Sequence, residues 1–152
     1  MAGMYCKQDD IETRISLVDL AKLTNDRQDE TAVDVVVLAS LINQAGVDID
    51  GALQGIFETP LSPTPDIITN LAVSIVIWRA FARRSASIEM PAHIQKEYDL
   101  AMETLNQIST LETYLGDGYP VLTSQGQMIA PTARPKFDFD NTDIEKPGIA
   151  WY

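Results

Sequence analysis

The sequence predicts an all-α fold: a bundle of four to five helices followed by a long extended C-terminal arm. Apolar residues recur every three or four positions along residues 33–56 and 94–115. Prolines and capping residues stand at the boundaries of these segments. The periodicity then stops, so we expect a helical domain over residues 1–115 and an arm over residues 116–152.

Composition indicates a folded domain with an acidic surface. Hydrophobic residues make up 45% of the 152 residues, which is enough for a core. The formal net charge of -11 repels phosphate backbones and argues against general binding of DNA or RNA. Such a charge suits either simple solubility or a partner with a basic docking surface.

Two short helices are expected first. Asp9 and Asp10 are well placed at the positive N-terminal end of a helix over residues 9–15. Ser16 can cap a second helix, which carries three leucines on one side, Leu17, Leu20 and Leu23. The polar residues 24–30 then form a loop.

A long third helix follows this loop. Thr31 with Asp34 three positions later matches a capping box, which predicts a helix start. The β-branched residues 35–37 could also begin a strand, but near-helical apolar spacing continues to Ile56, far beyond the length of a strand.

A proline corner separates the third helix from the fourth. Pro60, Pro63 and Pro65 leave too few N–H groups for a regular element. Thr64 is expected to cap the fourth helix, with Pro65 at its first position and its end near Ser85.

The fourth helix contains the most apolar window of the chain, residues 67–82. Arg79 interrupts this window, which is also shorter than the roughly 20 residues that a bilayer span requires. We therefore expect a central helix covered by protein on several sides, and no membrane association.

Pro91 is expected to open the last helix, which Gly116 and Gly118 end. Its apolar residues form a narrow stripe of the coiled-coil type, which either faces the core or lines a contact between subunits. The stripe comprises Ile94, Tyr98, Met102, Leu105, Ile108, Leu111 and Leu115.

The arm is rich in proline but also carries large apolar side chains, whose exposure is unfavourable. Extended, it could reach on the order of 120 Å, whereas the helical body has a radius of gyration of about 13 Å. The arm either docks on other subunits or folds back over its own. We predict that five residues of the arm dock on a partner protein: Phe137, Phe139, Ile144, Trp151 and Tyr152.

Signs of catalysis are weak, and we expect neither an enzyme nor a cofactor or metal site. The lone Cys6 excludes an internal disulfide, and a pair with His93 would lack a third group. Asp48 and Asp50 stand two apart on a helix and therefore point in different directions. No glycine-rich phosphate-binding loop is present in the sequence.

One basic cluster lies near the end of the fourth helix, at Arg79, Arg83 and Arg84. These arginines either interact with the negative C-terminal end of the helix dipole or form inter-subunit ion pairs. For the second case the possible partners are Asp48, Asp50 or Glu58 of the next subunit, and we predict Asp48 and Asp50.

The order of short motifs over residues 4–115 resembles the Mu-like phage family of small head–tail connector proteins. These motifs are Met4-Tyr5-Cys6 with Asp9-Asp10-Ile11, Leu23-Thr24-Asn25-Asp26, Ile49-Asp50-Gly51-Ala52-Leu53, Leu71-Ala72 with Ile75, Trp78-Arg79 and Arg83-Arg84. Two departures are evident. Ile56-Phe57 replaces a common Arg-Tyr pair, and Phe137-Asp138-Phe139-Asp140 has acids where relatives have arginine.

The resemblance implies a non-enzymatic virion protein at the head–tail interface, made in the host cytoplasm. It implies a homo-oligomeric ring, often a dodecamer, beneath the portal protein. The ring would extend the DNA channel, let packaged DNA pass without specific binding, and receive a tail or neck completion protein. The residues alone also fit a different class of protein, a small helical regulator that binds one protein partner.

Overall fold

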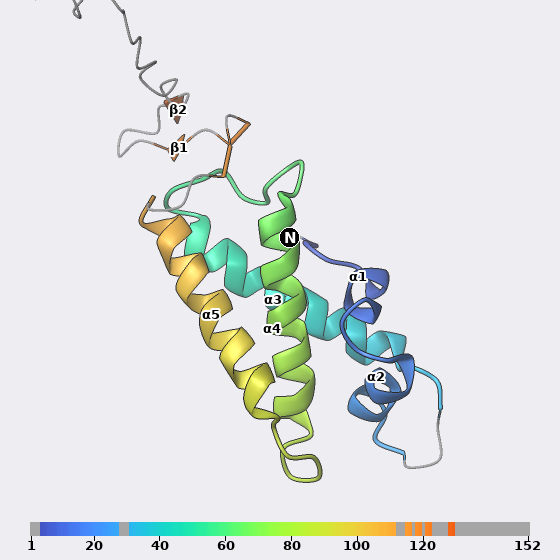
Figure 1. Cartoon of the computed structure of the whole chain (residues 1–152). Coiled ribbons are helices and arrows are strands. Elements are labelled where there is room, and N and C mark those ends of the chain that lie inside the picture. The colour runs from blue at the N-terminus through green and yellow to red at the C-terminus, as the bar shows by residue number, and fades with distance from the viewer. Residues whose placement is uncertain are drawn as a thin grey trace, which may run out of the picture.

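The computed structural model describes residues 4–27, 31–111, 115–116, 118–119, 121–122 and 128–129. Within these ranges the chain forms five helices and one small antiparallel sheet, which confirms the predicted all-α class (Figure 1). The helices are α1 Gln8–Glu12, α2 Leu17–Thr24, α3 Val35–Leu53, α4 Asp66–Arg83 and α5 Ala92–Ser109. Strand β1 Val121–Leu122 pairs with β2 Met128–Ile129.

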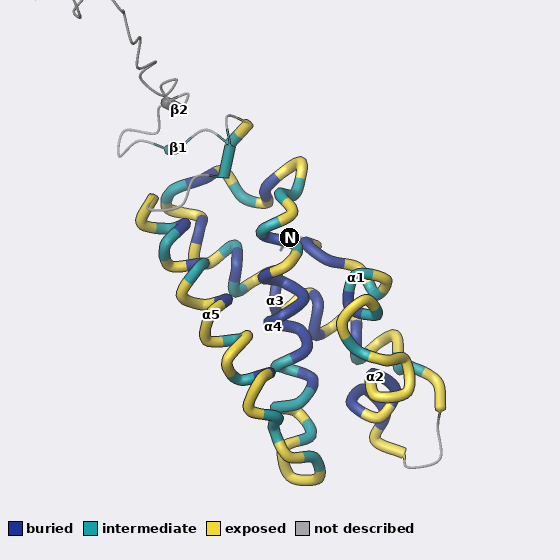
Figure 2. The backbone as a smooth tube through the Cα atoms, viewed as in Figure 1, coloured by how far each residue is buried: buried dark blue, intermediate teal, exposed yellow. Residues whose placement is uncertain are grey.

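Helix α4 is the centre of the bundle and contacts the four other helices. It lies between α5 on one side and the α1–α2 pair on the other, while α3 crosses behind it (Figure 1). Half of its 18 residues are buried, and the burial continues along most of its length (Figure 2). The prediction of a central helix covered by protein is therefore confirmed.

The starts of α2 and α3 both depend on a side-chain cap. Ser16 accepts a hydrogen bond from the backbone N–H of Asp19, as predicted. At α3 the expected pairing of Thr31 with Asp34 is wrong, because Asp34 is itself the cap. Its Oδ1 accepts from the N–H groups of Val36 and Val37 at 3.0 and 3.1 Å, so the helix begins at Val35.

The two helices that follow prolines begin one residue later than predicted. Pro65 and Pro91 have extended backbones and are the N-cap residues of α4 and α5, and neither cap makes a side-chain hydrogen bond. The Pro65 carbonyl already accepts from Thr69 N–H. A proline can serve there because an N-cap residue needs only its carbonyl for the helix.

Helix α5 ends earlier than predicted, at Ser109 instead of Leu115. Leu111 has a φ of 62°, in the left-handed region that commonly terminates a helix. Leu111 and Leu115 therefore lie outside the helix. Of the remaining stripe, Ile94, Leu105 and Ile108 are buried in the core, whereas Met102 is exposed.

Among the described residues, α3 meets the length and composition expected of a membrane-spanning helix, with a mean hydropathy of 1.3. Core helices of soluble proteins meet the same criterion, and a third of this window is buried inside the chain. Residues 67–82, which the sequence singled out as the most apolar stretch, belong to α4 and are largely core.

The N-terminal segment before α1 is part of the core, with Cys6 only 2% exposed. Burial, and secondarily the charge of Asp10, raises the pKa of Cys6 to about 12. The fold therefore favours the neutral thiol. The contribution of the neutral Cys6 thiol to folding stability is complete below the pKa of the unfolded chain, about 8.5. It is lost as the pH rises through the higher pKa of the folded chain.

We expect Cys6 to resist thiol reagents in the native protein near pH 8, because the reactive thiolate is both scarce and inaccessible. Labelling with a chromogenic disulfide reagent, followed by absorbance, should begin only when urea unfolds the chain. Rapid labelling without urea would contradict the burial of this segment.

Candidate docking site at the proline corner and the α4 arginines

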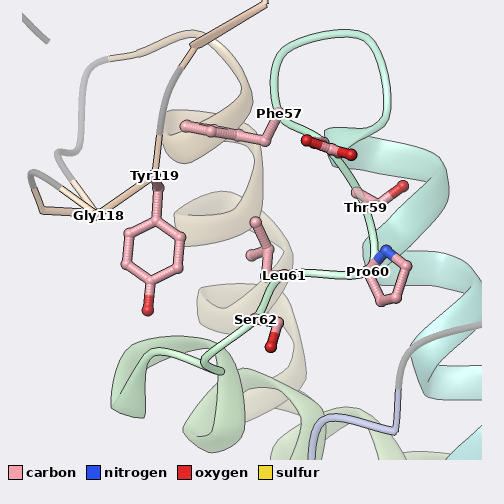
Figure 3. Close-up of a pocket in the computed structure, with 8 residues that line it drawn as sticks. Phe57, Thr59, Pro60, Leu61, Ser62, Gly118 and Tyr119 are labelled. Atoms are coloured by element: carbon pink, nitrogen blue, oxygen red, sulfur yellow. The ribbon is translucent and has the colours of Figure 1, made fainter. Parts of the chain in front are cut away.

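The connection between α3 and α4 forms a corner with a hollow of about 260 Å³. Phe57, Leu61 and Tyr119 supply its apolar walls (Figure 3). Phe57 and Leu61 are also anchored in the core, at 3% and 5% exposure. The hollow therefore lies where the helical body meets the beginning of the predicted arm.

Tyr5 ties the corner to two other parts of the chain. Its hydroxyl donates to Asp50 Oδ1 on α3 and accepts from the backbone N–H of Leu61 at 3.1 Å. Burial, and then the bond to the Asp50 carboxylate, raises the pKa of Tyr5 well above its usual value, so the phenol stays protonated. One hydroxyl thus joins the N-terminal segment, α3 and the corner.

The beginning of the arm is attached to this corner. Tyr119 Oη donates to the Pro63 carbonyl, and Leu122 N–H donates to the Ile56 carbonyl, both at 2.7 Å. Val121 also forms a bridge with Phe57. These residues of the arm therefore contact their own subunit, which is one of the two alternatives that the sequence left open.

The β1–β2 hairpin was also missed by the sequence analysis. A signal was present, because two apolar pairs flank five residues that include Gly126. The five predicted docking residues, Phe137, Phe139, Ile144, Trp151 and Tyr152, lie outside the described residues, and their role stays a prediction.

The α4 arginines bind acids of the same chain. Arg79 forms an ion pair with Asp48 on α3, with Nε 3.1 Å from Asp48 Oδ2, and donates to Gln44 at 3.2 Å. Arg83 donates to both carboxylate oxygens of Asp26, at 2.8 and 2.7 Å. Arg84 reaches the same carboxylate at 3.1 Å.

Two features of this arrangement bear on the predicted inter-subunit contact. Asp48 and Asp50 do point in different directions, toward Arg79 and Tyr5. Asp26 is the missed partner, since nothing local in the sequence marks an acid that is 57 residues away from Arg83. Pairing with a neighbouring subunit stays a prediction for these residues.

The side chains considered for catalysis lie on different elements of the bundle. His93 is exposed on α5 and Cys6 is buried before α1. In the described part of the chain, no three His, Cys, Asp or Glu side chains are grouped so that they could hold a metal ion.

A sequence model of the family described as Bacteriophage Mu, Gp36 matches residues 5–129, well over half of the chain. The chain belongs to this family. A search of curated proteins gave no match. As a member of the Gp36 family the protein is a bacteriophage structural or morphogenetic protein associated with the virion. The match includes α1–α5, the corner and the hairpin.

Replacing Tyr5 by Phe should destabilise the Gp36-family fold. The change keeps the buried ring but leaves the Leu61 N–H and the Asp50 carboxylate without this hydroxyl, at a cost of about 1–3 kcal/mol. Urea unfolding followed by circular dichroism measures the loss. Tyr98→Phe is a matched control, because the Tyr98 ring stacks on Trp78 in partly exposed surroundings. Equal stability of Tyr5→Phe and the native chain would contradict the bridging role.

The Arg79–Asp48 pair should stabilise the contact between α3 and α4 only modestly. Both side chains are about 30% exposed, and we expect a coupling energy of about 0.5–1 kcal/mol that falls with added salt. A double-mutant cycle with Arg79→Gln and Asp48→Asn, measured by urea unfolding, gives this value. Strictly additive effects of the two substitutions would show that the pair contributes nothing.

Proposed function

We propose that this protein is a head–tail connector, an adaptor that forms a ring under the portal of a tailed phage. The ring extends the DNA channel and joins the capsid to the tail. The observation that carries this proposal is the match to the Bacteriophage Mu Gp36 family over the helices, the corner and the hairpin. Membership of this family favours a role in the virion over the alternative of a small helical regulator that binds one protein partner.

The distribution of exposed apolar residues supports a ring. One group lies at the starts of α2 and α3, and another lies on α5. The starts of α2 and α3 lie on one side of α4 and α5 lies on the other (Figure 1). The first group comprises Leu17, Val18, Val35 and Val36, and the second Leu100 and Met102. Contact between two different surfaces repeats head to tail and closes into a ring when the rotation fits. We propose a dodecamer.

The charged residues have a secondary part in this proposed ring. Arg79, Arg83 and Arg84 are already paired within the chain, as is Asp48. Asp26, however, is 72% exposed and shared by two arginines, so an acid of the next subunit can join this cluster. The arginines thus contribute at the rim, and the apolar residues supply the main contact.

The arm and the acidic surface complete the proposal. The arm docks on the portal through Phe137, Phe139, Ile144, Trp151 and Tyr152, and a ring multiplies these weak attachments. The tail side receives a neck or tail completion protein. With a net charge of -11, the subunits repel DNA, so the genome passes the channel without binding.

Deleting residues 131–152 should abolish binding to the portal while leaving the helical body folded. The deletion spares all five helices and the hairpin, so the helical circular dichroism and cooperative unfolding should persist. Binding is measured by co-purification with the portal of the same phage and by the mass of the complex.

The control for this experiment is Val47→Lys in the full chain, which changes an exposed residue of α3 and should bind normally. If the truncated chain co-purified with the portal at full strength, the arm would not be the docking element. A lone monomer without portal decides nothing, because the portal can act as the template for the ring.

A further inference from the structure

A groove along α4 and α5 is a second apolar surface, distinct from the corner. It consists of two adjoining hollows of about 430 and 350 Å³, and Arg14 and Glu97 line both. Ile77, Phe81 and Ile94 form the apolar wall of the larger hollow, near the turn between α1 and α2. Ile67, Leu71 and Leu100 line the smaller one. We call this surface the α4–α5 groove.

The groove begins at the end of the bundle where the arm begins. Ile67 lies in the first turn of α4, directly after the corner, and Thr104 lies in the last two turns of α5. The corner also holds Tyr119 and Leu122. Phe137 follows Ile129 by eight residues, which can span about 26 Å, close to the length of α4 at about 27 Å. The segment from Ile129 to Phe137 is thus about as long, when extended, as the helix that carries the groove.

The chemistry of one arm segment suits this groove. In Phe137-Asp138-Phe139-Asp140, an extended backbone places both phenylalanines on one side and both aspartates on the other. The phenylalanines match the two apolar hollows, and the aspartates stay in water at the rim. The segment also carries two basic residues just before it, Arg134 and Lys136.

The charged residues that line the groove are compatible with binding of this segment. Arg14 donates to Ser74 Oγ at 2.8 Å and to Asn70 Oδ1 at 3.1 Å, and both partners are neutral. Among the described residues no carboxylate forms an ion pair with Arg14, in contrast to the three arginines near the end of α4. Glu97 and Asp19 supply negative charge in the same lining. Groove and segment thus each carry both signs of charge.

We propose that Phe137 and Phe139 pack in the α4–α5 groove of their own chain before assembly and leave it when the arm docks on a partner. A free subunit would otherwise expose these side chains to water, which is unfavourable. Attachment to the same chain gives the segment a high effective concentration at the groove. The release step rests on the proposed connector function, but the packing in the free subunit does not.

The test uses the full-length chain with a diazirine-bearing phenylalanine at position 137. Equal amounts of ¹⁴N- and ¹⁵N-labelled protein are mixed, diluted, irradiated and digested, and cross-linked peptides are identified by mass spectrometry. We expect cross-links from position 137 to α4 and α5 residues of the groove, joining peptides of the same isotope.

Paired variants show whether the groove itself is responsible. Leu100→Lys places a charge in the smaller hollow at a residue that is 62% exposed, so the fold should tolerate it. It should lower the cross-link yield by about tenfold. Val47→Lys changes a residue on α3 that is 52% exposed, and it should leave the yield unchanged.

Three results would overturn the proposal. Cross-links between different isotopes would assign the groove to the arm of a second copy, and an absence of cross-links to α4 and α5 would show that the groove is not the resting place. Cross-links that persist at full yield in a portal-bound sample would exclude release. Because the first two readouts need no portal, they remain decisive even if the connector function fails.

Discussion

The enclosure of α4 is the constraint on which the rest of this structure depends. The other four helices all pack on it, so a polar side chain that α4 directs toward a neighbour has to be satisfied at that boundary. Ser74 accepts from Arg14, Trp78 donates to Gln95, and Arg79 pairs with Asp48. These contacts hold the turn after α1, helix α5 and helix α3 against one helix.

The sequence predicted best what depends on neighbouring residues in the chain. The Ser16 cap follows from the preference of serine for helix starts, the central position of the fourth helix from its apolar composition, and the divergence of Asp48 and Asp50 from helical spacing. The sequence did not predict the end of α5, because Leu111 adopts the left-handed backbone conformation that glycine usually adopts at the end of a helix. The Asp26 cluster and the α4–α5 groove were missed for another reason: they join residues that only the fold brings together.

The in-chain ion pairs change the balance of forces expected at a contact between subunits. An exposed ion pair contributes at most about 1 kcal/mol, and here the arginines would exchange one carboxylate for another. Burial of apolar surface contributes roughly 25 cal/mol per Å² and requires no such exchange. Val35 and Val36 are 62% and 76% exposed, so they have more to gain from a neighbour than Arg79 has. A ring held in this way would respond weakly to salt.

An arm that serves two surfaces must bind the first of them weakly. Two phenylalanines in an open groove would contribute a few kcal/mol at most, after the entropy of ordering the segment is subtracted. The proposed portal contact, which also engages Ile144, Trp151 and Tyr152, would bury more apolar surface, and the proposed ring would add simultaneous attachments. The equilibrium then shifts by the difference between the two affinities, not by either one alone. The arm thus has two parts, the pair Phe137 and Phe139 and the later group Ile144, Trp151 and Tyr152. Because only the pair would bind the groove, the arm could cover the groove in the free subunit and still be released when the whole arm binds the portal.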